Sequence, residues 1–107
     1  MNLFVKGHGL SLPRALDDYV QRRVRFVIGR FGSKIAHVTV RIADTVRTNG
    51  EAGHGCRISA EISPSGRFPH HEVDDPCLSS AVDTAVERMG RSVRREVGQD
   101  YARPLPR

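Results

Sequence analysis

Apolar residues recur with two different periods along this chain, and the two periods divide it into helices and strands. Between about residues 12 and 31, and again between about residues 76 and 97, apolar positions fall three or four residues apart, the spacing of one face of an α-helix. The two stripes are Leu12, Leu16, Val20, Val24, Val27 and Phe31, then Leu78, Val82, Ala85, Met89 and Val93. The pattern predicts two amphipathic helices.

Residues that favour helix ends lie beside both stripes. Ser11 can cap the first helix, and Gly32 follows its last apolar residue. Asp75 can cap the second helix, with Pro76 at its first position, and Gly98 suggests its end. We therefore expect the helices to stop near Gly32 and Gly98.

Four shorter segments have the character of strands. Residues 2–6 form a short apolar run, and residues 35–43 and 56–62 alternate apolar and polar side chains. Residues 67–73 can form a fourth strand. Pro69 cannot donate a hydrogen bond to a neighbouring strand, so this strand is expected at an edge or with irregular pairing.

These elements follow the order β-α-β-β-β-α within 107 residues, a length that suits one domain. Strands with one apolar face and helices with one apolar stripe bury their surfaces by packing in two layers. We expect an α+β two-layer sandwich with both helices on one face of a four-stranded sheet. The domain should span residues 1–98, with residues 99–107 as a flexible tail.

Arginine dominates the charged residues. The formal net charge is +5, and all but Lys6 and Lys34 of the 17 basic residues are arginine. The planar guanidinium group suits phosphate and RNA contacts, although a GC-rich genome would also favour arginine codons. The composition therefore indicates an acidic partner without identifying it.

The first helix carries cations and aromatic rings along one edge of its apolar stripe. On a helical wheel this edge contains Tyr19, Arg22, Arg23, Phe26 and Arg30. Guanidinium groups spaced in this way can reach successive phosphates, and the rings can stack on unpaired bases. Alternatively, the arginines border the core and keep the helix soluble, while the rings cover the core edge.

The second helix has a similar basic flank. Three arginines recur at i, i+3 and i+7: Arg88, Arg91 and Arg95. Arg94 lies further round the wheel, and the wheel places Asp83 and Glu87 on the opposite, solvent-facing side. Two basic flanks on neighbouring helices predict a nucleic-acid-binding surface.

Other chemistry has less support in the sequence. The 5 histidines and 2 cysteines match no structural zinc spacing, and Cys56 is in phase with the apolar residues of its strand. Cys77, near a helix start, could have a lowered pKa, but no base accompanies it. We expect no metal, no cofactor, no small-molecule substrate and no catalytic residue. Without a signal peptide or an apolar stretch of about 20 residues, we expect a cytoplasmic protein that does not enter membranes.

Several short motifs accompany this order of elements. They are Gly7 after the first strand, Ala15-Leu16 and Tyr19-Val20 in the first helix, and Ser80-Ala81-Val82-Asp83 and Val86-Glu87-Arg88-Met89 with Arg91 in the second. With them, the chain resembles the short ribosome hibernation promoting factors, also called ribosome-associated inhibitors or sigma-54 modulation proteins, from Asn2 to about Glu96.

The resemblance implies a function and a set of contacts. It implies a non-enzymatic factor that binds small-subunit rRNA in the channel for mRNA and tRNA and inhibits translation during slow growth or stress. We expect this factor to be a monomer off the ribosome. Positions where the family has Lys or Arg imply rRNA contacts by Arg23, Arg88, Arg91 and Arg95. The helical wheel adds Arg22, Arg25, Arg30 and Arg94 to the candidate site.

The chain also departs from the family pattern. Phe26 stands where the family commonly has Lys, and Val27-Ile28 replaces a Leu-Glu pair. Pro13 occupies the place of a Thr cap, and Cys77-Leu78-Ser79 replaces an Asp-Met-Tyr run. Two alternatives therefore stay open: a general binder of double-stranded RNA, and a protein-interaction module whose partner patch is residues 26–28. Burial of all three patch residues would weaken the second.

Overall fold

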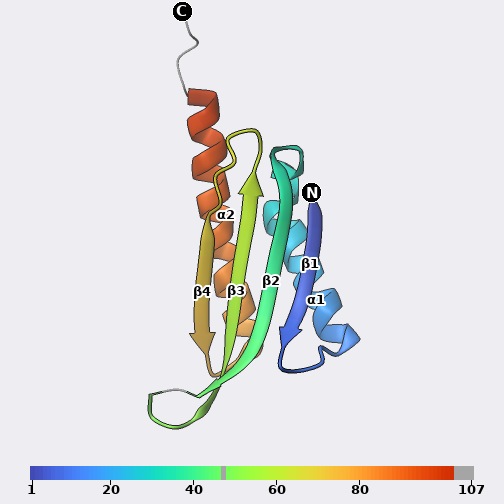
Figure 1. The fold of residues 1–107 in the computed structure, drawn as a ribbon, viewed down its shortest axis with the longest axis vertical. Coiled ribbons are helices and arrows are strands. Elements are labelled where there is room, and N and C mark those ends of the chain that lie inside the picture. The colour runs from blue at the N-terminus through green and yellow to red at the C-terminus, as the bar shows by residue number, and fades with distance from the viewer. Residues whose placement is uncertain (47, 103–107) are drawn as a thin grey trace, which may run out of the picture.

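A computed structural model describes residues 1–46 and 48–102 of the chain, with side chains up to residue 98. Its elements are β1 (Asn2–His8), α1 (Arg14–Ile28), the 3-10 helix η1 (Gly29–Lys34), β2 (Ile35–Val46), β3 (Ala52–Ile62), β4 (His70–Asp75) and α2 (Leu78–Ala102). Both helices lie behind a four-stranded sheet in Figure 1. The expected α+β two-layer sandwich is confirmed.

The sheet has the strand order β1-β2-β3-β4. β1 pairs with β2 in parallel, and the other two pairs are antiparallel. A parallel pair needs a long crossover connection, which α1 supplies, whereas β2 and β3 are joined by a short hairpin loop. β4 lies at an edge, as expected, but it spans His70–Asp75 instead of residues 67–73, so Pro69 lies just before the strand. One face of the sheet is covered by helices and the other is open (Figure 1).

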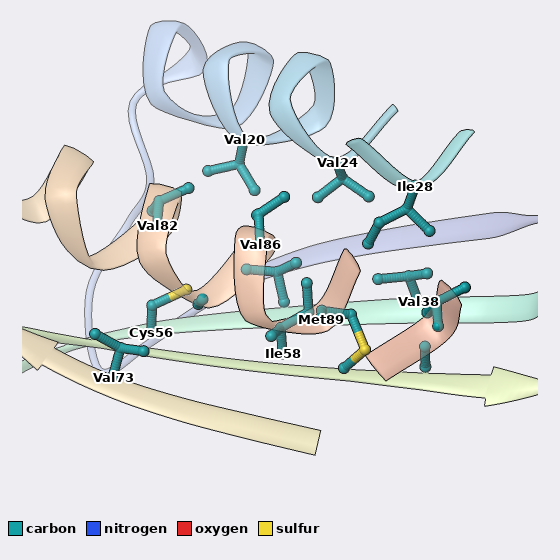
Figure 2. Packing of buried hydrophobic residues seen from close by; sticks show 14 of the residues in the cluster. Val20, Val24, Ile28, Val38, Cys56, Ile58, Val73, Val82, Val86 and Met89 are labelled. Carbon is teal, nitrogen blue, oxygen red and sulfur yellow. The ribbon is translucent and has the colours of Figure 1, made fainter. Parts of the chain in front are cut away.

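The core lies between the helices and the covered face of the sheet. Val20, Val24 and Ile28 of α1 point toward the stripe of α2 and toward the strands (Figure 2). Alternate strand residues complete the core from below, including Cys56 and Ile58, which are fully buried. Cys56 is therefore a core residue, as its phase in the strand predicted.

The two helices approach each other closely at Gly90. A Cβ atom placed on this buried glycine would lie 2.6 Å from Cγ1 of Val27, closer than two carbon atoms can pack. The absence of a side chain at residue 90 thus sets the distance between α1 and α2, and with it the spacing of their arginine flanks.

The boundaries of α1 differ from those predicted. Ser11 is not the cap: Pro13 occupies the N-cap position without a side-chain hydrogen bond, and its carbonyl oxygen accepts the amides of Leu16 and Asp17 at 3.0 Å. The α-helix ends at Ile28 and tightens into η1, where Gly29 and Gly32 weaken α-helical propensity. Continuous periodicity of apolar residues did not distinguish the two helix types.

The second helix continues beyond its predicted end. α2 passes through Gly98 to Ala102. Val97 is only 5% exposed, so burial on the core continues up to the residue before Gly98 and outweighs the cost of about 1 kcal/mol for a helical glycine. The predicted end of the helix at Gly98 was therefore wrong, while the tail over residues 99–107 stays a prediction, and residues 103–107 lie outside the described residues.

The strands β2 and β3 are also longer than predicted. Their pairing extends to Val46 and Ala52, beyond the predicted strand ends at residues 43 and 56. The two edge strands stop earlier: β1 ends opposite Ala43, and β4 ends opposite His54. The hairpin projects beyond the four-stranded region as a two-stranded ribbon (Figure 1).

Candidate nucleic-acid interface

A polar bridge joins the two helices beside their arginine flanks. The Tyr19 hydroxyl donates a hydrogen bond to Oδ1 of Asp83 at 2.5 Å, and Nε of Arg23 lies 3.1 Å from the same oxygen. Nη2 of Arg23 is 3.9 Å from Oε1 of Glu87. Asp83 and Glu87 therefore lie on the side of α2 opposite Arg88 and Arg95, as predicted, and Glu87 is exposed, but this side also faces α1. A wheel drawn for one helix does not show which flank its neighbour covers.

This bridge balances the charge of Arg23 and affects the pKa of Tyr19. The Arg23 side chain is 29% exposed and lies against two carboxylates, so much of its charge is balanced within the protein. The hydrogen bond to Asp83, followed by burial, raises the pKa of Tyr19 above its usual value and keeps the phenol protonated. Arg23 and Tyr19 thus hold α1 against α2, a role that the sequence analysis did not assign to either.

Arg22 is an exposed cation of α1 that borders two hollows. It lines a shallow hollow of about 320 Å³ together with Tyr19, Arg23 and Phe26. It also borders a second hollow, where Arg25 and Asp18 are neighbours. No salt bridge ties Arg22 within the part of the chain whose side chains are described, so its guanidinium group is available to an outside anion.

The arginines of α2 are all exposed but point in two directions. Burial lowers the pKa of His71 on β4, and the nearby positive charges of Arg88, His70, Arg95 and, least, Arg91 lower it further. Nε2 of His71 lies 2.7 Å from the Ser92 hydroxyl. Arg94 follows Asp83 by three helical turns and so lies on the side toward α1. Arg91 lies between these two directions.

Two of the predicted contacts lie apart from this surface. Arg25 is exposed beside Asp18, away from the bridge to α2. Arg30, at the start of η1, holds its guanidinium carbon 4.8 Å from the centre of the Phe31 ring. The eight predicted arginines are therefore spread over α1, η1 and α2, and we call this set the helical band; all of them except the half-buried Arg23 are exposed.

The alternative patch at residues 26–28 is divided by the fold. Ile28 is fully buried, and Val27 packs against the core beside Gly90. Phe26 is 82% exposed. A continuous apolar docking patch is absent from these three residues, and Phe26 alone borders the hollow beside Arg22.

The other candidate chemistry concerns the Cys77 thiol and possible metal ligands. Cys77 is exposed, and hydrogen bonding, first from the Ser79 side chain at 3.2 Å, lowers its pKa to about 7. Among the residues whose side chains are described, 1–46 and 48–98, no three His, Cys, Asp or Glu side chains are grouped so that they could hold a metal ion. Over the same described ranges, the helices are too short or too polar to span a bilayer.

Known structures share this fold. The N-terminal domain of Protein Y from Thermus thermophilus superposes with a TM-score of 0.71 at 23% identity, covering 90% of this chain and 99% of that one. A ribosomal subunit interface protein from Coxiella burnetii gives a TM-score of 0.73 at 10% identity, covering 92% and 99%. No curated protein matches the sequence.

The fold thus defines a class of small α+β domains that includes a subunit interface protein. Residues 3–99 match the sigma 54 modulation protein / S30EA ribosomal protein family, and the chain belongs to this family. The resemblance drawn from the sequence motifs is confirmed, and the chain is a member of a ribosome-associated class of proteins.

Proposed function

We propose that this protein binds rRNA of the small ribosomal subunit in the mRNA and tRNA channel and inhibits translation without catalysing a reaction. The observation that carries the proposal is the band of exposed arginines on two helices held side by side, in a member of a ribosome-associated family. Because ribosomes work in the cytoplasm, the proposal places the protein there. We expect it to be a monomer off the ribosome.

The proposed mechanism is electrostatic and steric. Exposed guanidinium groups on α1 and α2 replace counterions around rRNA phosphates, and the release of those ions favours binding. Arg88 and Arg95 are seven residues apart, which separates their Cα atoms by about 10 Å along the helix axis. The rigid two-layer body then occupies space that mRNA and tRNA need. Arg23 contributes by holding α1 against α2 through Asp83.

Co-sedimentation with purified small subunits across a salt series tests the proposal. The wild-type protein should bind at low salt and lose affinity steeply as salt rises, and it should inhibit translation in vitro. The Arg88→Glu, Arg91→Glu double variant should fold normally and fail to co-sediment. Unchanged co-sedimentation of this variant would refute the site.

A matched control separates a specific site from general charge. Arg91→Glu and Arg14→Glu both reverse one exposed helical arginine, but Arg14 lies in the first turn of α1 outside the proposed site. Arg91→Glu should weaken subunit binding and reduce the salt slope by about 1, whereas Arg14→Glu should change little. Equal effects would indicate a nonspecific basic surface. Equal affinity for an arbitrary RNA duplex would favour a general double-stranded RNA binder.

A further inference from the structure

The open face of the sheet carries a row of like charges across three strands. The register places Lys6 opposite Arg41, and Arg41 opposite Arg57. All three side chains are exposed on the face away from the helices. Arg57 is followed across the sheet by Glu72, whose carboxylate lies 3.4 Å from its guanidinium group. Directly opposed like charges destabilise a sheet, so this row has a cost in the free protein.

Two exposed aromatic rings lie on the same face. Phe4 occupies the position before Lys6 on this face of β1 and is 49% exposed. Phe68, which precedes β4, is 52% exposed and packs edge-on against His37, with ring centroids 6.0 Å apart. Neither ring belongs to the buried core. The face therefore combines cations with flat apolar surfaces that remain open to solvent.

Hollows connect these groups along β2. One hollow, of about 270 Å³, is bounded by Phe68, Arg41 and Arg57, with small hydroxyl side chains between them. Another, of about 170 Å³, lies on the other side of the same two arginines and has Gly55 in its lining. A Cβ atom on Gly55 would lie 3.1 Å from Cγ2 of Thr45, so the glycine keeps this hollow open.

We propose that the open sheet face binds single-stranded RNA, with phosphates at Lys6, Arg41 and Arg57 and bases stacked on Phe4 and Phe68. Four-stranded sheets with exposed aromatic rings and cationic neighbours suit this ligand, because every base has a face that can stack. An acidic peptide would satisfy the cations but would leave the two rings without a function. The negative charges of Glu72 and Asp74 on β4 repel phosphates, and this repulsion directs the RNA strand toward β1 and β2.

This surface is separate from the helical band, because the sheet and the helices expose opposite faces (Figure 1). A protein with both surfaces could contact rRNA phosphates through its helices and an unpaired RNA segment through its sheet. The inference does not depend on ribosome binding, and the two proposals can fail independently.

Fluorescence anisotropy with a labelled oligouridylate decamer tests the sheet surface. The Phe4→Leu, Phe68→Leu double variant keeps apolar side chains and removes both rings, and it should bind at least about tenfold more weakly. Phe26→Leu is the matched control, since it removes an exposed ring from α1, and it should bind like the wild type. Wild-type affinity of the double variant, or an equal loss in the control, would overturn the proposal.

Arg41→Gln gives a second readout that a merely structural role would not produce. It should weaken decamer binding and also raise the urea midpoint of the free protein, because it removes a like charge between two others. Weaker binding of Arg41→Gln with unchanged binding of the Phe4→Leu, Phe68→Leu variant would indicate an acidic partner and refute RNA stacking.

Arg91→Glu distinguishes the two surfaces. It should retain decamer binding while losing affinity for small subunits. Loss of decamer binding in this variant would place single-stranded RNA on the helices and overturn the sheet site, whatever its effect on subunit binding.

Discussion

Gly90→Ala tests how the close approach of α1 and α2 is maintained. In an ordinary helix interior, alanine is favoured over glycine by about 1 kcal/mol. Here the added Cβ would lie 2.6 Å from Cγ1 of Val27, so the helices must move or Val27 must leave its rotamer. A helical valine has one strongly preferred rotamer, and overpacking of this kind costs about 1–3 kcal/mol. The net expectation is a lower free energy of unfolding, by up to about 2 kcal/mol.

A double-mutant cycle with Val27→Ala provides the decisive comparison. Val27→Ala removes the atom that the new Cβ would strike. In that background, Gly90→Ala should therefore raise the free energy of unfolding by up to about 1 kcal/mol, through helix propensity alone. The sign of the effect should reverse between the two backgrounds, which corresponds to a coupling energy of about 1–3 kcal/mol.

Urea unfolding can be followed for this cycle by the helical signal in circular dichroism, because the chain contains no tryptophan whose fluorescence would report on unfolding. The reasoning is refuted if Gly90→Ala stabilises the protein in the wild-type background, or if its effect is equal in both backgrounds. Either result would mean that the helices can separate slightly at no cost, and that Gly90 does not set their spacing.

Three further predictions concern titratable groups. Cys77, with its pKa near 7, should react with a disulfide reagent with a midpoint near pH 7, whereas buried Cys56, whose pKa is raised to about 12 by burial, should react only after unfolding. Burial lowers the pKa of His71, so the unfolded chain binds its proton more readily, and the free energy of unfolding should fall as pH drops below about 6.5. His71→Asn should remove this part of the pH dependence, measured by urea midpoints at several pH values. Asp83→Asn should lower the pKa of Tyr19, measured by ultraviolet titration of the phenol.

Each of these outcomes has a clear opposite. Equal reaction rates of the two cysteines in the folded protein would contradict the burial of Cys56. An unfolding free energy that rises on acidification, or a pH dependence unchanged by His71→Asn, would show that His71 is not the group responsible. An unchanged Tyr19 titration in Asp83→Asn would mean that the helix bridge does not persist in solution.

Hydrophobic periodicity was sufficient to predict the element order and the two layers. The apolar stripes of α1 and α2 correspond to the buried faces, and Cys56 lies in the core as its phase indicated. Periodicity failed at the ends of elements, where tertiary contacts decide. Burial of Val97 carries α2 beyond Gly98, and the β2–β3 pairing continues through polar residues because backbone hydrogen bonds do not require apolar side chains.

The sequence predicted that the candidate arginines are exposed, but it predicted only some of the contacts around them. The sequence placed arginines beside the stripes, and seven of the eight candidates are exposed, with Arg23 half-buried. It could not show that Asp83 faces α1, because that depends on which side of α2 its neighbour lies. The cationic row on the sheet was missed as well: its signal was the polar phase of Arg41 and Arg57 in two strands, but only strand register shows that they are opposite each other.

The position of α2 in the chain has a consequence for synthesis. α2 supplies much of the core that covers the sheet, yet it follows every strand in the sequence. During translation, the earlier elements leave the ribosome first, and their apolar face lacks this cover until α2 has emerged. A surface assembled from both helices cannot exist on such an unfinished chain. Until α2 has emerged, a copy being made is therefore unable to present that surface.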